Sequence, residues 1–489
     1  MKKILISFVS LLALVSAVGC GNGSTLPGHG LPETPNFEVP ETGYNGEAVS
    51  LRFYHTMGAN LRTVLESYIV EFNKIYPNIQ INQEQVGNYD DVRTRINNEL
   101  TTGDQPNIAY CYPDHVALYN LAEAVTTLDN LIDSQIEVSR ADGTTEILGL
   151  TQEQKDDFIQ GYYNEGRQFG NGLMYSMPLS KSTEVLYYNK TFFETHSLSV
   201  PTHWYSTDAN DTTSMEYVAK KIKEIDSTSI PLGYDSESNL FITMTEQLGT
   251  PYTSASGERF LFNTKENKDF VLKFREWYQQ GLMTTQEIYG AYTSGLFVQT
   301  AKDQPKSYMS IGSSAGATHQ TPAIDTETGK YPFEVGIASI PQMNAENPKV
   351  ISQGPSVCVF QKDDPLEVVA SWLFVKFLTT NVEFQAEFSI ASGYVPVLKS
   401  VGQNETYKAQ FLDKADHGKY LPALSVKVCL EQEKAYYTSP AFNGSSTARD
   451  QVGLLMQTVL VGKAETDAEV KALVDKAFAD AIEYCKFYS

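Results

Sequence analysis

The chain has 489 residues, of which 37 are basic and 59 are acidic, and its formal net charge is −22 at pH 7. This length is sufficient for two domains, each with its own hydrophobic core. The acidic balance argues against a nucleic-acid-binding protein, because a phosphate backbone requires basic surfaces, although a local site could still hold a small anion. We expect no metal centre and no cofactor, because the cysteines of the mature chain lack metal-ligand spacing: Cys111, Cys358, Cys429 and Cys485.

The N-terminus predicts an exported protein that is anchored to a membrane. Two lysines precede an apolar run over residues 4–18, which is too short for a stable membrane span and is typical of a signal peptide covering residues 1–19. The run ends in AVGC, which resembles a lipobox and would make Cys20 the lipidated first residue. An ordinary cysteine after a standard cleavage site is the alternative. Residues 20–49 are rich in Gly, Pro and Thr, which predicts a flexible tether, so we expect a monomeric, extracytoplasmic lipoprotein.

The segment after the tether alternates strand and helix patterns. Short apolar runs predict strands over residues 51–54, 79–81 and 108–112. Apolar residues at helical spacing predict two helices between these strands, the first capped by Asn60 and the second reaching across residues 92–100. This alternation is typical of a doubly wound α/β sheet with right-handed crossovers, whose ligand loops follow the carboxyl ends of the strands. The loops contain Tyr54, His55, Tyr89, Tyr112 and Asp114.

Further elements are predicted along the rest of the chain. An aromatic, apolar run predicts a buried strand over residues 185–188. Helical periodicity predicts three more helices, over residues 215–225, 268–280 and 366–378. Asp364 precedes the last of these helices as its N-cap, and Thr466 and Glu469 form a capping box before a C-terminal helix. Two tryptophans on these helices are expected in the core: Trp277 and Trp372.

One stretch carries a family signature. Residues 178–195, PLSKSTEVLYYNKTFFET, place hydroxyl and amine side chains at the mouth of the buried strand. Such groups are common in a binding cleft, whereas a solvated loop is the alternative. The stretch resembles the signature of the family 1 extracellular solute-binding proteins of ABC importers, with the Tyr188-Asn189 pair in place and Thr195 departing from it. The resemblance includes residues 354–397 and extends over most of the mature chain.

This resemblance implies an α/β fold of the type II periplasmic-binding-protein class. Two lobes with doubly wound sheets, joined by hinge strands, would close over a small-molecule solute. The implied first lobe comprises residues 50–172 and 311–357, and the implied second lobe comprises residues 173–310 and 358–489. The implied function is to deliver the solute to the transmembrane subunits of an ABC importer, without catalysis.

Within the family, the chain most resembles the glycerol-3-phosphate-binding proteins, in residues 53–57 and in the Gly-Asn-Tyr loop at 87–89. The implied ligand is glycerol 3-phosphate or a glycerophosphodiester, whose phosphate would be held in part by Lys181 and Arg449. The segment around Arg449 is nearer to that of sugar-binding members, so a carbohydrate is the alternative ligand. Asp114 stands near the position of a ligand-binding glutamate in that group. The candidate ligand-binding residues are Tyr54, His55, Tyr89, Asp114, Lys181, Ser182, Ser313, Ser314, Gly354, Tyr394 and Arg449.

One enzyme motif is also present. Residues 312–316, GSSAG, fit the G-x-S-x-G nucleophile elbow, which would make Ser314 the nucleophile of a serine hydrolase. The elbow must lead directly into a helix, but residues 317–322 are a poor helix former. We therefore expect a turn, or a ring of hydroxyl and N–H donors, at this position and no enzymatic activity.

Overall fold

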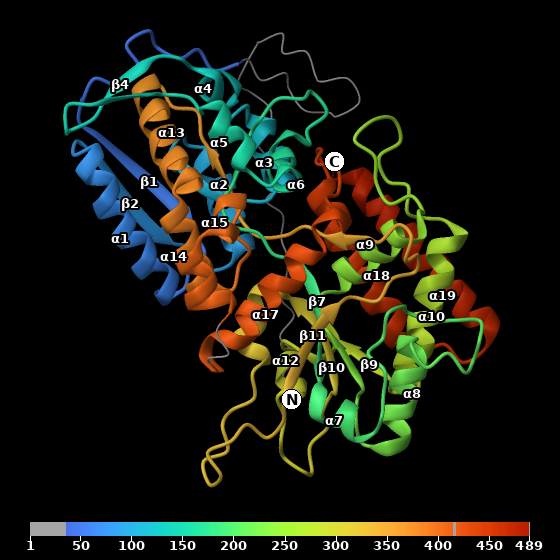
Figure 1. Cartoon of the computed structure of the whole chain (residues 1–489). Helices are drawn as coiled ribbons and strands as arrows, with labels where there is room; N and C mark the ends of the chain where they lie inside the picture. The colour runs from blue at the N-terminus through green and yellow to red at the C-terminus, as the bar shows by residue number, and fades with distance from the viewer. Residues whose placement is uncertain (1–35, 414–416, 489) are drawn as a thin grey trace, which may run out of the picture.

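Two five-stranded sheets organise the chain, and each forms the centre of one lobe (Figure 1). The computed structural model describes residues 36–413 and 417–488. The strand order of the first sheet is β2 (Ile79–Gln85), β1 (Val49–His55), β3 (Ile108–Cys111), β13 (Ser356–Val359) and β6 (Met177–Pro178). The first three strands are parallel, whereas β13 is antiparallel to both of its neighbours.

The second sheet combines strands that lie far apart in the sequence. Its strand order is β11 (Val335–Ser339), β7 (Glu184–Asn189), β10 (Met309–Ser313), β8 (Leu232–Tyr234) and β9 (Met283–Thr285). Strands β8, β9 and β10 are mutually parallel, while β7 is antiparallel to β10 and β11. Two small sheets pair β12 (Val350–Ile351) with β14 (Tyr436–Tyr437) and β4 (Glu137–Ser139) with β5 (Thr145–Ile147).

Helices cover both faces of the first sheet, as expected for a doubly wound lobe. The helices that share one core with the sheet are α1 (Ala59–Ile75), α13 (Pro365–Thr380) and α14 (Val382–Ser392). The other face is covered by α2 (Tyr89–Leu100) and α3 (Pro113–Tyr119). Shorter helices of this lobe are η1 (Asn120–Ala122), α4 (Asp129–Asp133), α5 (Gln152–Asp157), α6 (Gln160–Tyr163), η2 (Asn164–Arg167), α15 (Lys399–Gln403) and α16 (Glu405–Tyr407), which leads into η4 (Lys408–Leu412).

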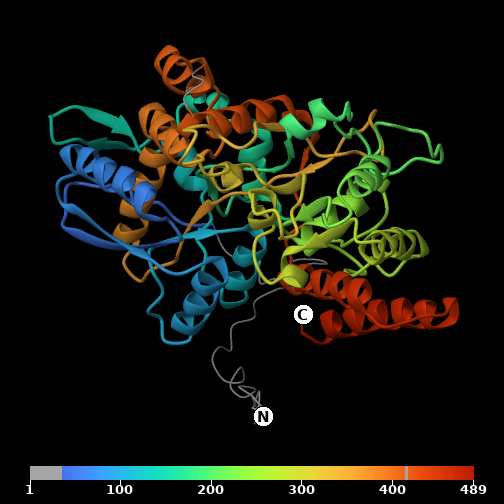
Figure 2. The same ribbon diagram turned by 90° about the horizontal axis from the view of Figure 1, so that it is seen from below.

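The second sheet is covered in the same way. One face packs against α8 (Met215–Ile225), α9 (Glu237–Leu248), α10 (Lys265–Gln279), α18 (Ser445–Val461) and α19 (Asp467–Phe487). The other face packs against α17 (His417–Glu431) and the 3₁₀ helix η3 (Ser314–Gln320). Shorter helices are α7 (Lys190–Thr195), α11 (Gln286–Tyr289), α12 (Ser294–Phe297) and η5 (Glu433–Ala435). The view in Figure 2 separates the blue elements of the first lobe from the green and red helices of the second.

Local sequence signals account for several helix ends. The Asp364 side chain accepts a hydrogen bond from Leu366 N at the start of α13, and Thr466 and Glu469 form the expected capping box of α19. The Asn60 cap was wrong, because α1 begins at Ala59, and Gly58 occupies the N-cap in an extended conformation. Asn60 therefore lies inside the first turn of the helix.

Two segments that cross between the lobes run side by side. Residues 179–183 connect β6 to β7, and residues 352–355 lead from β12 to β13. Ser182 N donates to Gln353 O at 2.9 Å, and Gln353 N donates to Ser182 O at 2.8 Å. A relative motion of the lobes must therefore bend these paired segments, which is the structure of a hinge.

The sheets divide the chain differently from the expected lobe boundaries. Residues 311–357 were expected in the first lobe, but β10 and β11 both pair into the sheet of the second lobe. Residues 358–489 were expected in the second lobe, but β13 and the helices α13 and α14 pack into the first. The crossing before β13 lies some forty residues later than the sequence implied, because the strand after the GSSAG motif turns back to pair with β7.

The expected core residues are buried. Trp277 and Trp372 have no exposed surface, and Cys111 and Cys358 are unpaired and buried on the neighbouring strands β3 and β13. Within residues 36–413 and 417–488, no helix is both long and apolar enough to cross a membrane. The expected signal peptide and the lipidated Cys20 lie outside the described residues. The expected flexible tether was wrong for residues 36–49, because Phe37 and Tyr44 are buried in the core of the first lobe.

Candidate functional site

A cleft divided into two chambers lies between the lobes. The first chamber has a volume of about 380 Å³ and the second a volume of about 560 Å³. The two chambers share Gln353, from the crossing segment, and Arg449, from α18. These two residues form what we call the waist of the cleft. Both volumes lie within the range of about 300–1,000 Å³ that is typical of small-molecule sites.

Both lobes contribute to the first chamber. The N-terminal parts of α2 and α3 line it from the first lobe, and the N-terminus of α18 lines it from the second. The rings of Tyr89 and Tyr112 lie beside each other here, with centroids 4.5 Å apart. The charged side chains of the chamber are Asp90, Arg93, Asp114, Glu165, Glu287, Arg449 and Asp450. Carboxylates therefore outnumber guanidinium groups, and the chamber is acidic.

The second chamber is lined mainly by the second lobe. The carboxyl ends of the parallel strands β8, β9 and β10 meet at its wall, as expected for a binding site of a doubly wound sheet. Hydroxyl and amide groups predominate, and the two carboxyl groups are Glu184 and Asp235. The lining residues that can hydrogen-bond through uncharged side chains are Ser236, Asn239, Gln286, Tyr292, Ser294, Ser313, His319, Gln320, Gln353 and Tyr394.

The arginines of the cleft already have polar partners. Arg449 Nη1 donates to Asn239 Oδ1 at 2.8 Å, and Arg449 Nε lies 4.0 Å from Asp114 Oδ2 of the opposite lobe. Burial lowers the pKa of Arg449, but Asp114 and the nearby tyrosines raise it, and the net shift is upward. Arg93 pairs with Asp90 at 3.1 Å. Arg449 therefore remains charged, and a carboxylate lies beside each of the two guanidinium groups.

Glu184 forms a buried polar network at the wall of the second chamber. Tyr234 Oη donates to Glu184 Oε2 at 2.6 Å, and Asn239 Nδ2 donates to Glu184 Oε1 at 3.1 Å. Burial raises the pKa of Glu184 to about 7, although these two hydrogen bonds oppose the shift. Since Asn239 also accepts from Arg449, the network connects the waist of the cleft to β7.

A buried ion pair lies at the base of the first chamber. Lys181 Nζ is 2.5 Å from Glu165 Oε1, and their side chains are 0% and 2% exposed. Lys181 also donates to Ser356 Oγ at 3.0 Å, and Ser352 Oγ donates to Glu165 Oε2 at 3.3 Å. The pair therefore connects both crossing segments to η2. Glu165 lines the chamber, and Lys181 fixes the position of its carboxylate from behind.

The structure brings some of the sequence-predicted site residues to the cleft. Those that line a chamber are Tyr89, Asp114, Ser313, Tyr394 and Arg449. Ser182 and Gly354 belong to the paired crossing segments behind the waist, where Gly354 has a φ of +94°. Lys181 does not line a chamber, because its ammonium group is buried against Glu165.

Tyr54 and His55 lie in the interior of the first lobe and line neither chamber. The Tyr54 hydroxyl accepts from Arg95 Nη2 at 2.8 Å and donates to Glu99 Oε1 at 3.1 Å. The His55 ring bonds to Gln83, and burial lowers its pKa to about 4. Both side chains therefore connect elements of the first lobe.

Several residues of the chambers were not found from the sequence. Asp235, Tyr292 and Gln353 follow strands or lie in connecting segments without a recognisable motif. Asp235 follows β8, so its position after a parallel strand was the available signal. Gln353 is adjacent to the predicted Gly354, and its role emerges only from the pairing of the two crossing segments.

The geometry of Ser314 agrees with the expected turn and does not resemble a nucleophile elbow. Its side chain is fully buried, and Ser314 Oγ accepts a hydrogen bond from Thr183 N at 3.1 Å. The residues after it form a 3₁₀ helix, η3, and no α-helix follows the motif. Ser314 therefore joins the GSSAG segment to the crossing segment at residues 179–183.

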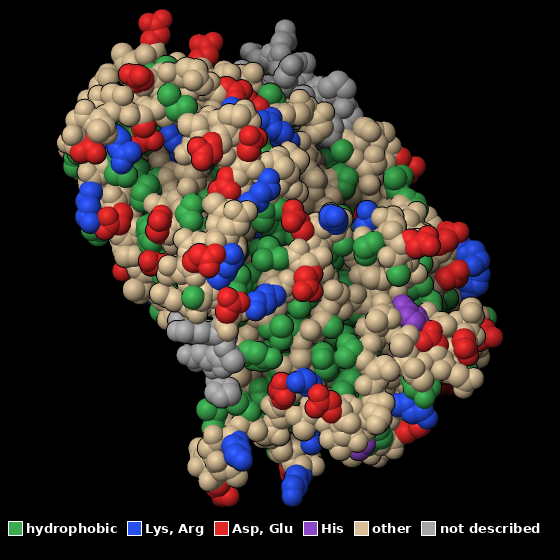
Figure 3. Space-filling model, in the orientation of Figure 1, with side chains coloured by type: hydrophobic (Ala, Val, Ile, Leu, Met, Phe, Trp, Pro, Cys, Tyr) green, Lys and Arg blue, Asp and Glu red, His purple; other side chains and the backbone are tan. Residues whose placement is uncertain are grey.

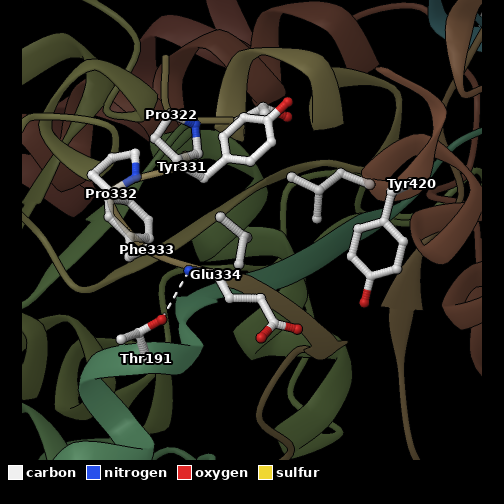
Figure 4. Close-up of a pocket in the computed structure, with 10 residues that line it drawn as sticks. Thr191, Pro322, Tyr331, Pro332, Phe333, Glu334 and Tyr420 are labelled. Atoms are coloured by element: carbon white, nitrogen blue, oxygen red, sulfur yellow. Dashed lines mark hydrogen bonds between the residues drawn. The ribbon is translucent and has the colours of Figure 1, made fainter. Parts of the chain in front are cut away.

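A third cavity, of about 640 Å³, lies apart from the cleft on the second lobe. It is lined by α7, the segment from Thr321 to Val335, and α17 (Figure 4). Glu334 N donates to Thr191 Oγ1 at 2.9 Å at one side of it. Proline, aromatic and aliphatic side chains dominate the lining, and Figure 3 shows hydrophobic side chains gathered over α17 and β11. This apolar lining offers few partners for the hydroxyl or phosphate groups of a polar solute.

Comparison with known proteins identifies the family. A family model described as bacterial extracellular solute-binding protein matches residues 67–412. The sn-glycerol-3-phosphate-binding periplasmic protein UgpB of Escherichia coli (strain K12) is 24% identical over 366 residues, which are 73% of this chain and 76% of that protein.

Solved structures confirm the type II periplasmic-binding-protein fold. UgpB from Mycobacterium tuberculosis, in complex with glycerophosphocholine, has a TM-score of 0.67 and 17% identity, and the match covers 90% of this chain and 98% of that chain. The cyclic alpha-maltosyl-1,6-maltose binding protein from Arthrobacter globiformis has a TM-score of 0.63 and 18% identity. This match covers 89% of this chain and 99% of that chain. The chain belongs to the bacterial extracellular solute-binding proteins, which are the binding components of ABC importers and are not enzymes.

Proposed function

We propose that the solute is a neutral carbohydrate, bound in the divided cleft and delivered to the membrane permease. The observation that carries this proposal is the charge of the cleft, where seven carboxyl groups line the chambers together with two arginines. Carboxylates accept hydrogen bonds from sugar hydroxyls, and tyrosine rings offer flat apolar faces for stacking against a sugar. Both kinds of group meet in the first chamber.

The same charge argues against glycerol 3-phosphate, which the sequence resemblance favoured. A phosphate monoester carries close to two negative charges at neutral pH and requires basic side chains that are free to bind it. Arg93 and Arg449 are balanced by Asp90 and Asp114, and Lys181 is buried against Glu165. A doubly charged ligand would therefore meet repulsion from the other carboxyl groups that line the chambers.

A glycerophosphodiester with a cationic alcohol is the second candidate. It carries one phosphate charge, which Arg449 would hold, and an ammonium group, which suits the Tyr89–Tyr112 pair beside Asp90 and Asp114. The relative from Mycobacterium tuberculosis was solved with glycerophosphocholine, which has this chemistry.

Isothermal titration calorimetry on the purified mature chain separates the three ligand classes. The panel contains neutral mono- and disaccharides, sn-glycerol 3-phosphate and glycerophosphocholine, each at low and high salt. We expect tight, salt-independent binding of a neutral saccharide, because no net ligand charge is screened. Binding of either phosphate compound in preference to every sugar would contradict the carbohydrate assignment. Asp114→Asn serves as the matched variant, because it should strengthen a phosphate ligand and weaken a sugar.

We also propose that lipidation of Cys20 anchors the protein to the cell membrane on its extracytoplasmic side. The support is the signal-peptide pattern that ends in AVGC. A Cys20→Ser variant should appear in the soluble fraction after cell fractionation. Membrane retention of a variant whose signal peptide has been removed would contradict the lipid anchor.

A further inference from the structure

His115 is a buried histidine in the lining of the first chamber. It lies in α3, and its side chain is packed among aromatic rings, with centroid distances of 5.4 Å to Tyr112 and 6.5 Å to Tyr119. The residue is only 4% exposed, and within residues 36–413 and 417–488 its Nδ1 atom has no hydrogen-bond partner. A half-turn of the ring about its Cβ–Cγ bond exchanges each nitrogen with a ring carbon, so the ring can present a nitrogen to the chamber.

The imidazole ring of His115 is uncharged at neutral pH. Burial lowers its pKa, and although Asp114 and Asp90 act in the opposite direction, the net shift is downward. A neutral imidazole has one N–H donor and one nitrogen lone pair. It can therefore either donate a hydrogen bond or accept one.

An unpaired nitrogen at this position lowers the stability of the protein. A buried polar atom without a partner loses its hydrogen bonds to water and gains none in return. Phenylalanine would fill the same space between the two tyrosines without this cost. Ser439 Oγ, which lines the same chamber, is likewise buried without a partner among the described residues. Such unpaired groups require an explanation other than packing, and a ligand that completes their hydrogen bonds provides one.

Resting on the proposed carbohydrate function, we propose that His115 is a ligand-binding residue that hydrogen-bonds to a hydroxyl group of the solute in the first chamber. A hydroxyl group both donates and accepts, so it can pair with either nitrogen of the neutral ring. A solute that lacks this hydroxyl would leave the imidazole unpaired in the closed cleft. His115 therefore determines specificity for a hydroxyl at this position.

Substitution by phenylalanine separates binding from packing. His115→Phe keeps an aromatic ring between the two tyrosines and removes both nitrogens, so it should unfold at the same or a higher temperature than the native chain. It should bind the sugar about tenfold more weakly, because one hydrogen bond is lost. The amide variants His115→Asn and His115→Gln each place a polar group near one ring nitrogen, and at least one of them should bind more tightly than His115→Phe.

Tyr119→Phe is the matched control. Tyr119 lies one turn further along α3, and its hydroxyl is also buried without a partner among the described residues, but it lines neither chamber. Removing this hydroxyl should leave the unfolding temperature the same or higher, as for His115→Phe. It should not change the affinity for a sugar.

The test combines thermal unfolding without ligand and calorimetry with glucose, galactose, maltose and sucrose, on the full mature chain and these variants. Affinities are compared for the sugar that the native chain binds most tightly. Unchanged affinity in His115→Phe, or no recovery in either amide variant, would overturn the inference and leave the carbohydrate function standing. A lower unfolding temperature for His115→Phe than for Tyr119→Phe would assign His115 a structural role and also overturn it. If the native chain bound none of these sugars, the carbohydrate function would fail, and this inference would fail with it.

Discussion

The buried carboxyl group of Glu184 should change its protonation with pH in the folded protein. Burial raises its pKa to about 7, whereas an exposed glutamate has a pKa of about 4.3. The folded state therefore holds this proton more tightly than the unfolded state. The contribution of this group to stability is complete below about pH 4 and is lost as the pH rises through about 7.

Glu184→Gln should remove this pH dependence. Glutamine can still accept the hydrogen bond from Tyr234 but loses the one from Asn239 Nδ2, and this loss is the same at every pH. Relative to the variant, the native chain should lose up to about 3 kcal/mol of unfolding free energy between about pH 5 and pH 8, from the size of the pKa shift. Urea unfolding at the two pH values measures the difference. If the native chain and Glu184→Gln differ in unfolding free energy by the same amount at pH 5 and at pH 8, the pKa of Glu184 is not raised.

The ion pair of Lys181 and Glu165 should contribute strongly only while both partners are present. Lys181→Met leaves the Glu165 carboxylate buried without its counter-charge, which should reduce the unfolding free energy by about 3–5 kcal/mol. The double variant Lys181→Met with Glu165→Gln should recover most of this loss. Lys265→Met is the control, because Lys265 and Asp269 are 80% and 55% exposed and their pair should contribute less than about 1 kcal/mol. If urea unfolding shows that Lys181→Met and Lys265→Met lose the same unfolding free energy, this role of the Lys181–Glu165 pair is contradicted.

Residues of the site could be predicted where a local motif fixes their position. The Gly-Asn-Tyr loop and the Gly-Tyr segment place Tyr89 and Tyr394 at the chambers, as the resemblance implied. Lys181 was placed in the wrong environment, because its partner Glu165 lies in η2 and carries no motif. Burial of a charged side chain depends on such a tertiary partner, which a single sequence does not reveal.

At the level of elements, Gly354 is required where the two crossing segments touch. It has a φ of +94°, and an added Cβ would lie 2.6 Å from Ser180 O and 2.8 Å from Lys181 Cα. Both contacts are with backbone atoms of the other crossing segment, which cannot rotate away. A side chain here must therefore separate the paired segments that form the hinge.

Gly354→Ala should destabilise the protein and weaken solute binding, because the waist residue Gln353 would shift with the segment. Gly103→Ala is the matched control, since Gly103 also has a positive φ, of +74°, but open space at the Cβ position. The control isolates the conformational strain of about 1–2 kcal/mol. Thermal unfolding should show a larger loss of stability, and calorimetry a larger loss of solute affinity, for Gly354→Ala than for Gly103→Ala. Equal losses in the two variants would mean that the close approach of Gly354 to the other crossing segment is not important.

Elements could be predicted from the sequence where helical periodicity is strong, as for α8, and where a cap agrees with it, as for α13. The assignment of elements to lobes was wrong, because it depends on which strand pairs with which. β10 and β11 both pair with β7, so the chain stays in the second lobe through residue 339. Nothing in the local pattern of β11 distinguishes this pairing from a return to the first sheet, since strand pairing is set by long-range contacts.

For the molecule as a whole, contacts across the cleft join the two lobes on the side of α18. Arg93 of α2 donates to the Ser446 hydroxyl, and Asp114 of α3 lies 4.0 Å from Arg449. The chain also crosses between the lobes in the paired segments 179–183 and 352–355, which can bend, and a third time between η4 of the first lobe and α17 of the second. A solute bound between these surfaces adds contacts to both lobes and should favour the arrangement in which they approach each other.

Solute binding should therefore reduce the radius of gyration of the protein in solution, as measured by small-angle X-ray scattering with and without a saturating sugar. Arg449→Ala should bind at least about tenfold more weakly, because it loses a charge-assisted hydrogen bond at the waist, and should therefore require at least about tenfold more sugar to become compact. Tyr420→Ala should become compact like the native chain, because its cavity lies apart from the cleft. If the native chain kept the same radius of gyration at a concentration that calorimetry shows to be saturating, binding would not be coupled to closure, and the crossing segments would act as a rigid support instead of a hinge.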